Sequence, residues 1–334
     1  MRTVVDKIAA TEQVAETGRL LLEQRLVART WGNFSARLDE THFCITPSGL
    51  GYEHMTAADI VCCDLTDGSY TGERCPSSEL GIHRAAYRLF PETGFVIHTH
   101  QTYATALGLT GTEHWEITRE ERERLGGVAR ADYGLPGTEK LHQAVTAAME
   151  TGAQTVLMVH HGALLCGHDR ADAMARAALL EEICRRSCRG QESPPALWSE
   201  AETAQLRERL RITCPTADVV STDAARAWSL LRRPLIAQLD DMAQMVGWII
   251  PVAKNAPNAQ VMLRSRSAVL LPGAGILVQG SDAEDTEALK QLTHKAAVAA
   301  LHCRAWGEKA RLPLKDCLYL RRFYLKKYAE RKRG

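Results

Sequence analysis

Two short apolar runs in the first half of the chain each lead into histidines. Residues 94–97 (GFVI) precede His98 and His100, and residues 155–159 (TVLMV) precede His160 and His161. Apolar runs of this length, the second of them rich in β-branched residues, predict buried strands. The start of the chain and the stretch after the second strand carry amphipathic or alanine-rich patterns that predict helices. Together these patterns predict an α/β fold.

A polar, proline-rich segment, residues 189–195 (RGQESPP), interrupts the chain as an interdomain linker does. The 334 residues, 45% of them hydrophobic, suffice for two separate cores. We therefore predict one domain over residues 1–190, and a second over residues 191–334 that ends in a basic tail.

The second half is similar to the first and reads as a degenerate copy of it. Residues 268–280 align with residues 156–167, and residues 235–247 align with the strand and helix around His98. Ala274 then stands where His161 does, and the other segment has no histidine, so we expect no equivalent metal in the second copy. That segment also contains two acidic residues, Asp240 and Asp241. We interpret them as a helix-capping pair more readily than as functional groups.

The histidines of the first half have the spacing of a metal site. Residues i and i+2 of a strand face the same way with Cα atoms roughly 6.6 to 7 Å apart, so His98 and His100 can converge on one ion. The end of the second strand can present a third imidazole. A single histidine in an apolar strand is more often a hydrogen-bonded core residue, but the combination with an acidic residue favours a metal. Three protein nitrogens leave one coordination position open, as in catalytic zinc sites.

The acidic residue is Glu79, within CPSSELGIH at residues 75–83. A proline followed by two serines indicates a loop that runs into a helix, and a helix start of this kind caps its own N–H groups or binds phosphate. Residues 30–35 (TWGNFS) and 46–49 (TPSG) combine glycine with hydroxyl or amide side chains, as anion-binding turns do. Taken singly, each of these two segments is better explained as an ordinary connection.

Taken in order, five motifs resemble the class II aldolase/adducin family over residues 5–190, most closely its L-fuculose-phosphate aldolase branch. The motifs are Gly32-Asn33-x-Ser35, Thr46-Pro47-Ser48-Gly49, Pro76-Ser77-Ser78-Glu79, His98-x-His100 and His160-His161-Gly162. The resemblance implies two tandem class II aldolase-like α/β/α domains, each with a central, mostly antiparallel sheet flanked by helices. It implies that one divalent metal ion, most readily Zn²⁺, is bound by His98, His100 and His161, and that Glu79 is the catalytic acid/base. It further implies six ligands for a substrate phosphate: Gly32, Asn33, Ser48, Gly49, Ser77 and Ser78.

The reaction that the resemblance implies is reversible cleavage of a ketose 1-phosphate to dihydroxyacetone phosphate and an aldehyde. The metal would stabilise the enediolate, and Glu79 would move the proton at its carbon. Relatives bring a tyrosine from a neighbouring subunit, ahead of a Gly-Gly pair, to protonate the aldehyde. Here the stretch before Gly126-Gly127, residues 116–125, has no tyrosine and predicts a solvated helix. The candidates that remain are Tyr133, Tyr319, Tyr324 and Tyr328.

Other activities stay open at this stage. An L-ribulose-5-phosphate 4-epimerase would use the same chemistry, although such epimerases typically carry aspartate where this chain has Glu79, and a methylthioribulose-1-phosphate dehydratase is a third possibility. A non-catalytic scaffold of the adducin kind is the alternative from another class, and the full set of metal ligands argues against it. Because relatives form fourfold rings with active sites between subunits, we expect a homo-oligomer. Two tandem chains would give a pseudo-fourfold ring in which the second half supplies the missing proton donor.

Charge and cysteine content narrow the partners further. The net charge of +1, from 41 basic and 40 acidic residues, gives no overall electrostatic attraction to nucleic acid or a membrane. The basic residues between 321 and 333 are interpreted as one side of a solvated helix. The chain lacks an apolar stretch of membrane-spanning length and does not begin with a signal peptide. We therefore expect the ten cysteines to be reduced thiols in the cytoplasm, and the partner to be a small sugar phosphate.

Overall fold

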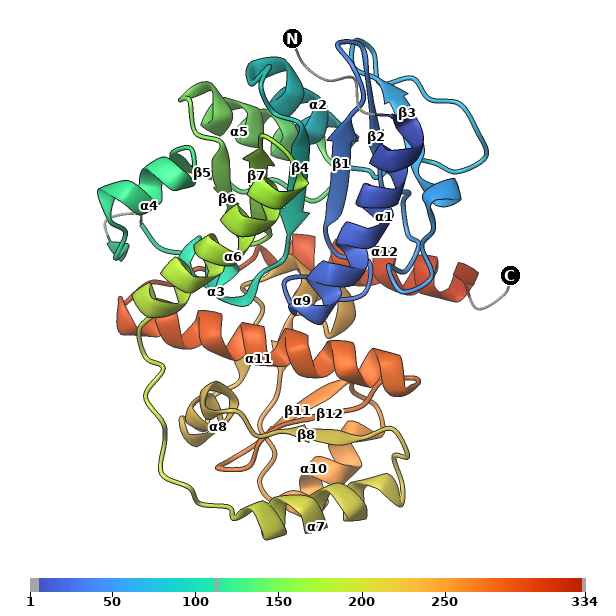
Figure 1. Cartoon of the computed structure of the whole chain (residues 1–334). Helices are drawn as coiled ribbons and strands as arrows, with labels where there is room; N and C mark the ends of the chain where they lie inside the picture. Colours follow the sequence, from blue (N-terminus) through green and yellow to red (C-terminus); the bar gives the residue numbers. More distant parts are fainter. Residues whose placement is uncertain (1–5, 112–113, 332–334) are drawn as a thin grey trace. The chain divides into compact units, whose positions relative to one another are not determined.

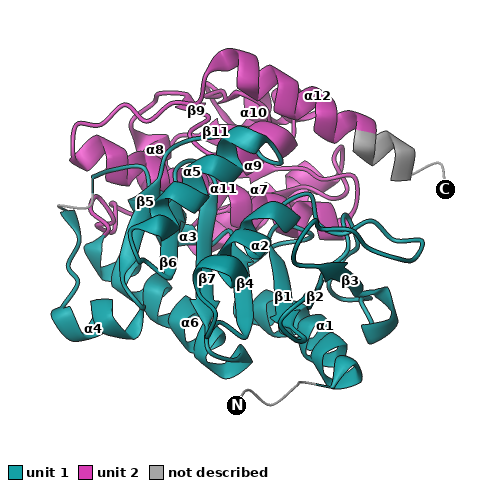
Figure 2. Cartoon of the chain, turned by 90° about the horizontal axis from the view of Figure 1, so that it is seen from above, with its two compact units in different colours: residues 1–187 teal, residues 188–334 magenta. Residues whose placement is uncertain are grey.

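The computed structural model describes residues 6–111 and 114–331. The chain forms two compact units, Met1–Ser187 and Cys188–Gly334, which Figure 2 colours separately. We describe each unit by itself.

Unit 1 is built around a seven-stranded sheet (Figure 1). Its strands are β1 (Asn33–Arg37), β2 (His42–Ile45), β3 (Val61–Asp64), β4 (Phe95–Thr99), β5 (Val128–Ala131), β6 (Thr155–Met158) and β7 (Gly162–Gly167). Their order across the sheet is β3-β2-β1-β4-β7-β6-β5, and every neighbouring pair is antiparallel except β5–β6. In this register Asn33 pairs with His98, so the start of β1 lies beside the end of β4.

Helices cover both faces of this sheet. The helices on one face are α1 (Lys7–Glu23), α3 (Thr102–Leu107) and α6 (Arg170–Ser187), those on the other are α2 (Leu80–Leu89) and α5 (Glu139–Glu150), and the connections hold α4 (Arg119–Arg124) and a 3₁₀ turn (Ala57–Asp59). Successive residues of a strand face opposite sides of the sheet. Phe95 and Ile97 of β4 accordingly pack into the core under α1 and α6, whereas Val96 packs into the core under α2 and α5.

Unit 2 has shorter strands and longer helices. Its elements are α7 (Glu200–Arg211), β8 (Asp218–Val220), α8 (Asp223–Leu230), β9 (Leu235–Ile236), α9 (Asp240–Met245), β10 (Ile249–Ile250), α10 (Ala256–Leu263), β11 (Ala268–Leu271), β12 (Gly275–Val278), α11 (Ala283–Ala305) and α12 (Leu314–Arg331). Three strands form a sheet in the order β11-β12-β8, and Val252 adds a parallel bridge to Leu270 beyond β11. Leucines of α7 and α10 pack against this sheet.

The two units share a local arrangement of strands. The hairpin β6–β7 closes on the pair Met158↔Gly162, and β11–β12 closes on Leu271↔Gly275. The helix that follows begins at residue 170 in unit 1 and at residue 283 in unit 2, so both features are displaced by the same 113 residues (162 to 275, 170 to 283). Beyond the hairpin, unit 1 continues with antiparallel β4 on one side and parallel β5 on the other. Unit 2 has antiparallel β8 and the parallel bridge at Val252 in those places.

The strand beside this hairpin in unit 2 differs from the one that the sequence suggested. Residues 235–247 were expected to match the strand and helix around His98, but β9 pairs only with β10. The neighbour of β12 is β8, where Val220 pairs with Ile276 as Thr99 pairs with Ala163. Helices α8 and α3 each begin three residues after that pair. Val219 and Ser221 therefore stand where unit 1 has His98 and His100.

The acidic pair of unit 2 does not cap its helix, contrary to the sequence-based interpretation: the N-cap of α9 is Leu239, and no side chain makes a capping hydrogen bond there. Asp240 and Asp241 are the first two residues of α9 and both are fully buried. Asp241 accepts a hydrogen bond from the neighbouring Met242 amide at 2.7 Å and forms a buried ion pair with Lys295 of α11.

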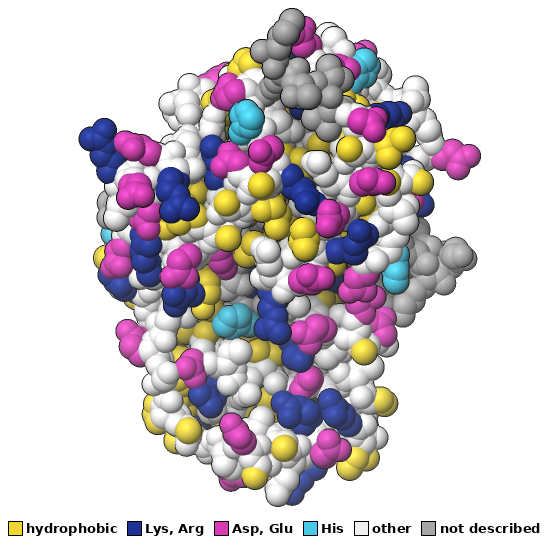
Figure 3. All heavy atoms as spheres, viewed as in Figure 1, with side chains coloured by type: hydrophobic (Ala, Val, Ile, Leu, Met, Phe, Trp, Pro, Cys, Tyr) yellow, Lys and Arg dark blue, Asp and Glu magenta, His cyan; other side chains and the backbone are white. Residues whose placement is uncertain are grey.

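The predicted class of fold is confirmed. A mostly antiparallel sheet lies between two layers of helices, and the predicted strands at 94–97 and 155–159 correspond to β4 and β6. None of the helices in the described part of the chain combines the length and apolar composition needed to cross a membrane. On the face drawn in Figure 3, basic and acidic side chains are interspersed, as the near-zero net charge leads one to expect.

Candidate metal centre

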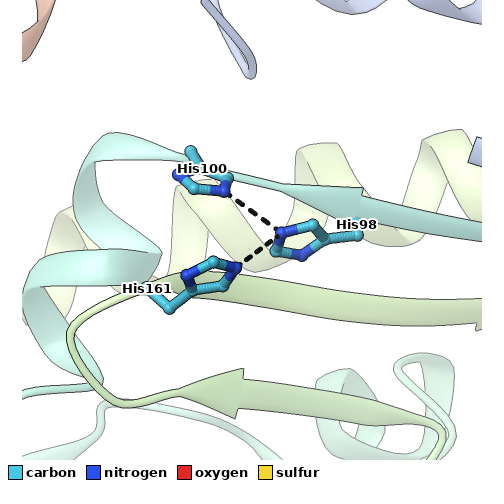
Figure 4. A group of neighbouring side chains, drawn as sticks. All are labelled: His98, His100 and His161. Carbon is cyan, nitrogen blue, oxygen red and sulfur yellow. Dashed lines mark hydrogen bonds between the residues drawn. The ribbon is translucent and has the colours of Figure 1, made fainter. Parts of the chain in front are cut away.

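Three imidazoles converge at the end of β4 and the turn between β6 and β7 (Figure 4). His98 and His100 come from β4 and the residue after it, and His161 comes from the turn that enters β7. The Nε2 atom of His98 lies 3.1 Å from the Nε2 atom of His100 and 3.1 Å from that of His161. All three residues are buried.

The backbone fixes the protonation of His98. Its Nδ1 atom lies 2.9 Å from the carbonyl oxygen of Ala163, which can only accept a hydrogen bond, so Nδ1 carries the proton. In the neutral ring Nε2 then presents its lone pair toward the other two histidines. Such an Nδ1–H to carbonyl hydrogen bond is typical of histidines that bind a metal through Nε2.

Glu79 closes the group on its fourth side. Its carboxylate oxygens lie 3.2 Å from Nε2 of His98 and 2.9 Å from Nε2 of His161. Burial acts to raise the pKa of Glu79, but His98, His161 and a hydrogen bond from Asn33 together hold that pKa well below its usual value. The carboxylate is therefore ionised. Although Glu79 is the N-cap residue of α2, its side chain makes no capping hydrogen bond and turns to the histidines instead.

The donor set fits a divalent metal ion. Two nitrogens that each lie about 2.1 Å from one ion at a tetrahedral angle are roughly 3.4 Å apart, close to the 3.1 Å between the imidazole nitrogens here. Three nitrogens and one carboxylate also match the usual ligands of zinc and of other transition metals. Gly162 is required beside this centre, because a Cβ atom there would lie 2.1 Å from the Thr99 carbonyl oxygen.

A buried chain of hydrogen bonds lies behind Glu79. Asn33 Nδ2 donates to Glu79 Oε2 at 2.8 Å, and Asn33 Oδ1 lies 2.5 Å from His83 Nε2. The other ring nitrogen of His83 lies 2.6 Å from Ser35 Oγ, which lies 2.8 Å from the Tyr87 hydroxyl. Because the carboxylate accepts only, the Asn33 amide must present Oδ1 to His83, and His83 must donate from Nε2 and accept at Nδ1. Every bond in the chain then has one direction, from Tyr87 toward Glu79.

Sequence reasoning missed His83, Tyr87 and the role of Ser35 in this chain. A signal was available, since His83 follows Glu79 by four residues and residues four apart lie on the same side of a helix. Burial lowers the pKa of His83 to about 3, with a smaller contribution from His98. The ring therefore stays neutral, as its hydrogen bonds require.

The segments predicted to hold a phosphate lie close to this centre. The loop at 46–49 runs beside residues 75–79, with hydrogen bonds from the Ser48 amide to the Cys75 carbonyl at 2.9 Å and from the Ser77 amide to the Thr46 carbonyl at 3.1 Å. Gly32 and Gly49 have positive φ angles of 99° and 79°, which favour glycine. The Asn33 side chain is engaged at both ends by Glu79 and His83. The role of these six residues in phosphate binding stays a prediction.

The remaining candidates have other positions. His160 takes a left-handed backbone angle, φ 67°, in the turn before His161, and its ring meets Tyr133 edge-on at 5.1 Å between centroids. Tyr319 and Tyr324 lie on α12 of unit 2, and the side chain of Tyr328 is outside the described part of the chain.

Comparisons with known proteins show what the chain is similar to. A sequence model described as the class II aldolase and adducin N-terminal domain matches residues 12–188, more than half of the chain. YgbL of Klebsiella pneumoniae, a candidate aldolase/epimerase/decarboxylase, is 25% identical, with 55% of this chain and 89% of that chain covered and a TM-score of 0.50. YgbL of Escherichia coli is 24% identical, with 60% and 99% covered and a TM-score of 0.51. The L-fuculose-1-phosphate aldolase of Thermus thermophilus is 25% identical, with 54% and 92% covered and a TM-score of 0.44. With a family match over more than half of its length, the chain belongs to the class II aldolase and adducin family.

Proposed function

We propose that the chain is a metal-dependent aldolase that reversibly cleaves a ketose 1-phosphate to dihydroxyacetone phosphate and an aldehyde. The observation that carries the proposal is the convergence of three imidazole Nε2 atoms and one ionised carboxylate on a single buried point. A scaffold protein gains nothing from such a group, because taking three imidazoles and an ionised carboxylate out of water costs free energy. We further propose His98, His100 and His161 as the ligands, and Zn²⁺ as the ion.

A divalent ion held there would supply a Lewis acid for the substrate carbonyl. The protein's own contribution is the placing of a base. Glu79 is ionised and can take a proton from the substrate carbon next to that carbonyl, and return it in the reverse direction. Asn33 holds one oxygen of the carboxylate, and His83 holds Asn33, so Glu79 keeps one orientation during proton transfer.

The substrate phosphate is assigned to the three loops beside the centre. The proposed ligands are Gly32, Asn33, Ser48, Gly49, Ser77 and Ser78, of which the glycines and serines offer backbone N–H groups and hydroxyls. Positioning the phosphate would fix the distance between Glu79 and the reacting carbon. Replacing Ser77 and Ser78 by alanine should therefore raise KM for the phosphorylated substrate without releasing the metal.

The first experiment measures deuterium incorporation into dihydroxyacetone phosphate in D₂O by NMR. The native protein should exchange one hydrogen of the hydroxymethyl carbon, removal of metal by a chelator should stop the exchange, and Glu79→Gln should lose it. Glu150→Gln, at the exposed end of α5, is the matched control and should exchange as the native protein does. Absence of exchange in metal-loaded native protein, both alone and with a panel of aldehydes, would refute the aldolase assignment.

We also propose that unit 2 is a shortened copy of unit 1 that binds no equivalent metal. The shared hairpin register supports this, and Val219, Ser221 and Ala274 take the places of the three histidines. Metal analysis should find one ion per chain in the native protein and much less than one in His161→Ala. His168→Ala, at an exposed position after β7, is the control and should keep its metal. Two ions per chain would contradict the assignment.

The proposed setting is a homo-oligomer in the cytoplasm. All ten cysteines are free thiols, as a reducing compartment requires. Light scattering at assay concentration measures the assembly, and a fully active monomer would refute the oligomer.

A further inference from the structure

A cavity of about 330 Å³ lies within unit 2, outside everything assigned above. It is formed by the turn after α10, the segment after β12, the end of α9 and one residue of α12. Its polar lining consists of Arg264, Ser265, Arg266, Ser267, Gln279, Ser281 and Arg321. Three of these residues carry positive charge, and none of the twelve lining residues is acidic.

Among the described residues, the three arginines lack the carboxylate partners that some arginines of the same unit have. Arg207 pairs with Asp218, and Arg226 pairs with Asp223 at 2.5 Å. Within the described part of the chain, Arg264, Arg266 and Arg321 take part in no such ion pair. Their charge is therefore not neutralised by a carboxylate of the described residues.

Arg321 is held in place for such a role. Its Nη1 atom donates to the carbonyl oxygens of Gln244 at 3.0 Å and Met245 at 2.5 Å, at the end of α9. These bonds anchor one corner of the guanidinium and leave the donors on Nε and Nη2 without a described acceptor. Partial burial lowers the pKa of Arg321, since it removes water from the charged group without supplying an anion.

Gln279 gives a second, independent indication of a ligand. Its side-chain oxygen position is buried and has no hydrogen-bond partner among the described residues. Because the two ends of an amide are interchangeable, the same position can present an N–H donor to an anion. Ser281 is less available, because its hydroxyl is bonded to Asp282 at 2.9 Å and to Asp285.

We propose that this cavity binds the dianionic phosphate group of a small phosphate monoester. Two or more guanidinium groups around one pocket are the usual means of binding such a group, through charge-assisted and often bidentate hydrogen bonds. A volume of about 330 Å³ is at the lower end of the range for small-molecule sites, so the ligand is a phosphate with a remainder no larger than a small sugar. The corresponding positions of unit 1 under the 113-residue displacement are residues 151–154, and they contain no arginine. The site is therefore a property of unit 2 and does not depend on the proposed aldolase activity.

The test uses phenylglyoxal modification of arginines in the full chain, mapped residue by residue by mass spectrometry. Arg264 and Arg266 are exposed and should react in the absence of ligand. Arg209, an exposed arginine of α7 with no ion pair to the described residues, should react as well and serves as the internal control. Inorganic phosphate at about ten times its dissociation constant should slow the modification of Arg264 and Arg266 roughly tenfold and leave Arg209 unchanged. Chloride at the same ionic strength should protect none of them.

A variant separates this site from any phosphate bound in unit 1. By equilibrium dialysis with inorganic phosphate, Arg264→Gln with Arg266→Gln should lose one bound phosphate per chain, whereas Arg209→Gln should keep the native number. Equal protection of Arg209, protection by chloride, or a double variant that binds phosphate as the native chain does would each overturn the proposal. Native deuterium exchange in the double variant is expected, because none of these residues belongs to the proposed catalytic group.

Discussion

His83 is the residue whose replacement tests the buried chain behind Glu79 most directly. His83→Leu removes a donor and an acceptor together, so that Asn33 Oδ1 and the Ser35 hydroxyl both lose a partner in the core. Each buried polar group left in this way destabilises a protein by about 1 to 3 kcal/mol. We expect His83→Leu to lower the free energy of unfolding by about 2 to 6 kcal/mol, and His83→Gln, which keeps one donor and one acceptor, to lower it by less.

The pH dependence supplies a second signature of the same residue. The pKa of His83 is about 3 in the folded chain, against an ordinary value of about 6.5 when unfolded. Protonation therefore favours the unfolded state, so the stability that the neutral ring provides is complete above pH 6.5 and is lost as the pH falls toward 3. At 1.36 kcal/mol for each pKa unit, about 2 kcal/mol should be lost between pH 8 and pH 5. His83→Gln cannot titrate and should lack this part of the slope.

The assay is urea unfolding of metal-free native protein and of both variants between pH 5 and pH 8. Removing the metal makes the titration of the three ligand histidines common to all samples, so the difference between native protein and His83→Gln isolates His83. The difference should narrow by about 2 kcal/mol from pH 8 to pH 5. A constant difference across that range would refute the assignment of His83 as a neutral, buried link. In the metal-loaded enzyme, His83→Leu should lower the rate of deuterium exchange while metal content stays native, because Asn33 no longer holds Glu79 in one orientation.

Three further outcomes follow from the fold of unit 1 and from burial. A Cβ atom at Gly162 would lie 2.1 Å from the Thr99 carbonyl oxygen, so Gly162→Ala should lower the free energy of unfolding by about 1 to 3 kcal/mol, whereas Gly51→Ala, with open space around it, should be neutral by the same denaturation assay. Burial raises the pKa of Cys44, Cys63, Cys166 and Cys303 to about 12, so a thiol reagent at pH 8 should label exposed Cys75 first and leave those four unreacted in the folded chain. A hydrogen bond from Arg186 lowers the pKa of Glu121 to about 2, so the difference in melting temperature between native protein and Arg186→Gln should be constant above about pH 4.5 and shrink as the pH falls toward 2.

The strands of unit 1 and the convergence of its histidines could be predicted from the sequence because one local rule governs both. The alternation of a strand places every second side chain on the same face, so an apolar run that ends in His-x-His carries its geometry with it. β4 begins one residue after the predicted start and extends to Thr99. The third histidine required only that another strand end nearby. The contacts of His98 with Ala163 and with Glu79 join elements that local patterns cannot pair. They can be recognised only once the register of the sheet is known.

The charged side chains show the limit of prediction from local sequence patterns. A glutamate after Pro-Ser-Ser predicts a helix start stabilised by its own first turn. In the structure Glu79 is the N-cap of α2, yet its carboxylate serves Asn33, His98 and His161. A negative charge near the three imidazoles stabilises the structure by more than a capping hydrogen bond, which contributes about 1 kcal/mol. Departures of this kind are expected at functional sites, where local preference and chemistry compete.

The strand that sequence comparison placed wrongly in unit 2 also separates the two roles within the His-His-Gly motif. Apolar composition could not distinguish Val219 and Val220 from residues 235–236, because each pair lies in a short strand next to a helix. The hydrogen-bond register does distinguish them. In that register the three histidines are replaced by valine, serine and alanine, but the glycine is kept as Gly275. A Cβ atom there would lie 2.1 Å from the Val220 carbonyl oxygen, the same distance that separates a Cβ atom at Gly162 from Thr99. The glycine is therefore required by the close approach of two strands, which both units share. The histidines are required for chemistry, which only unit 1 would need.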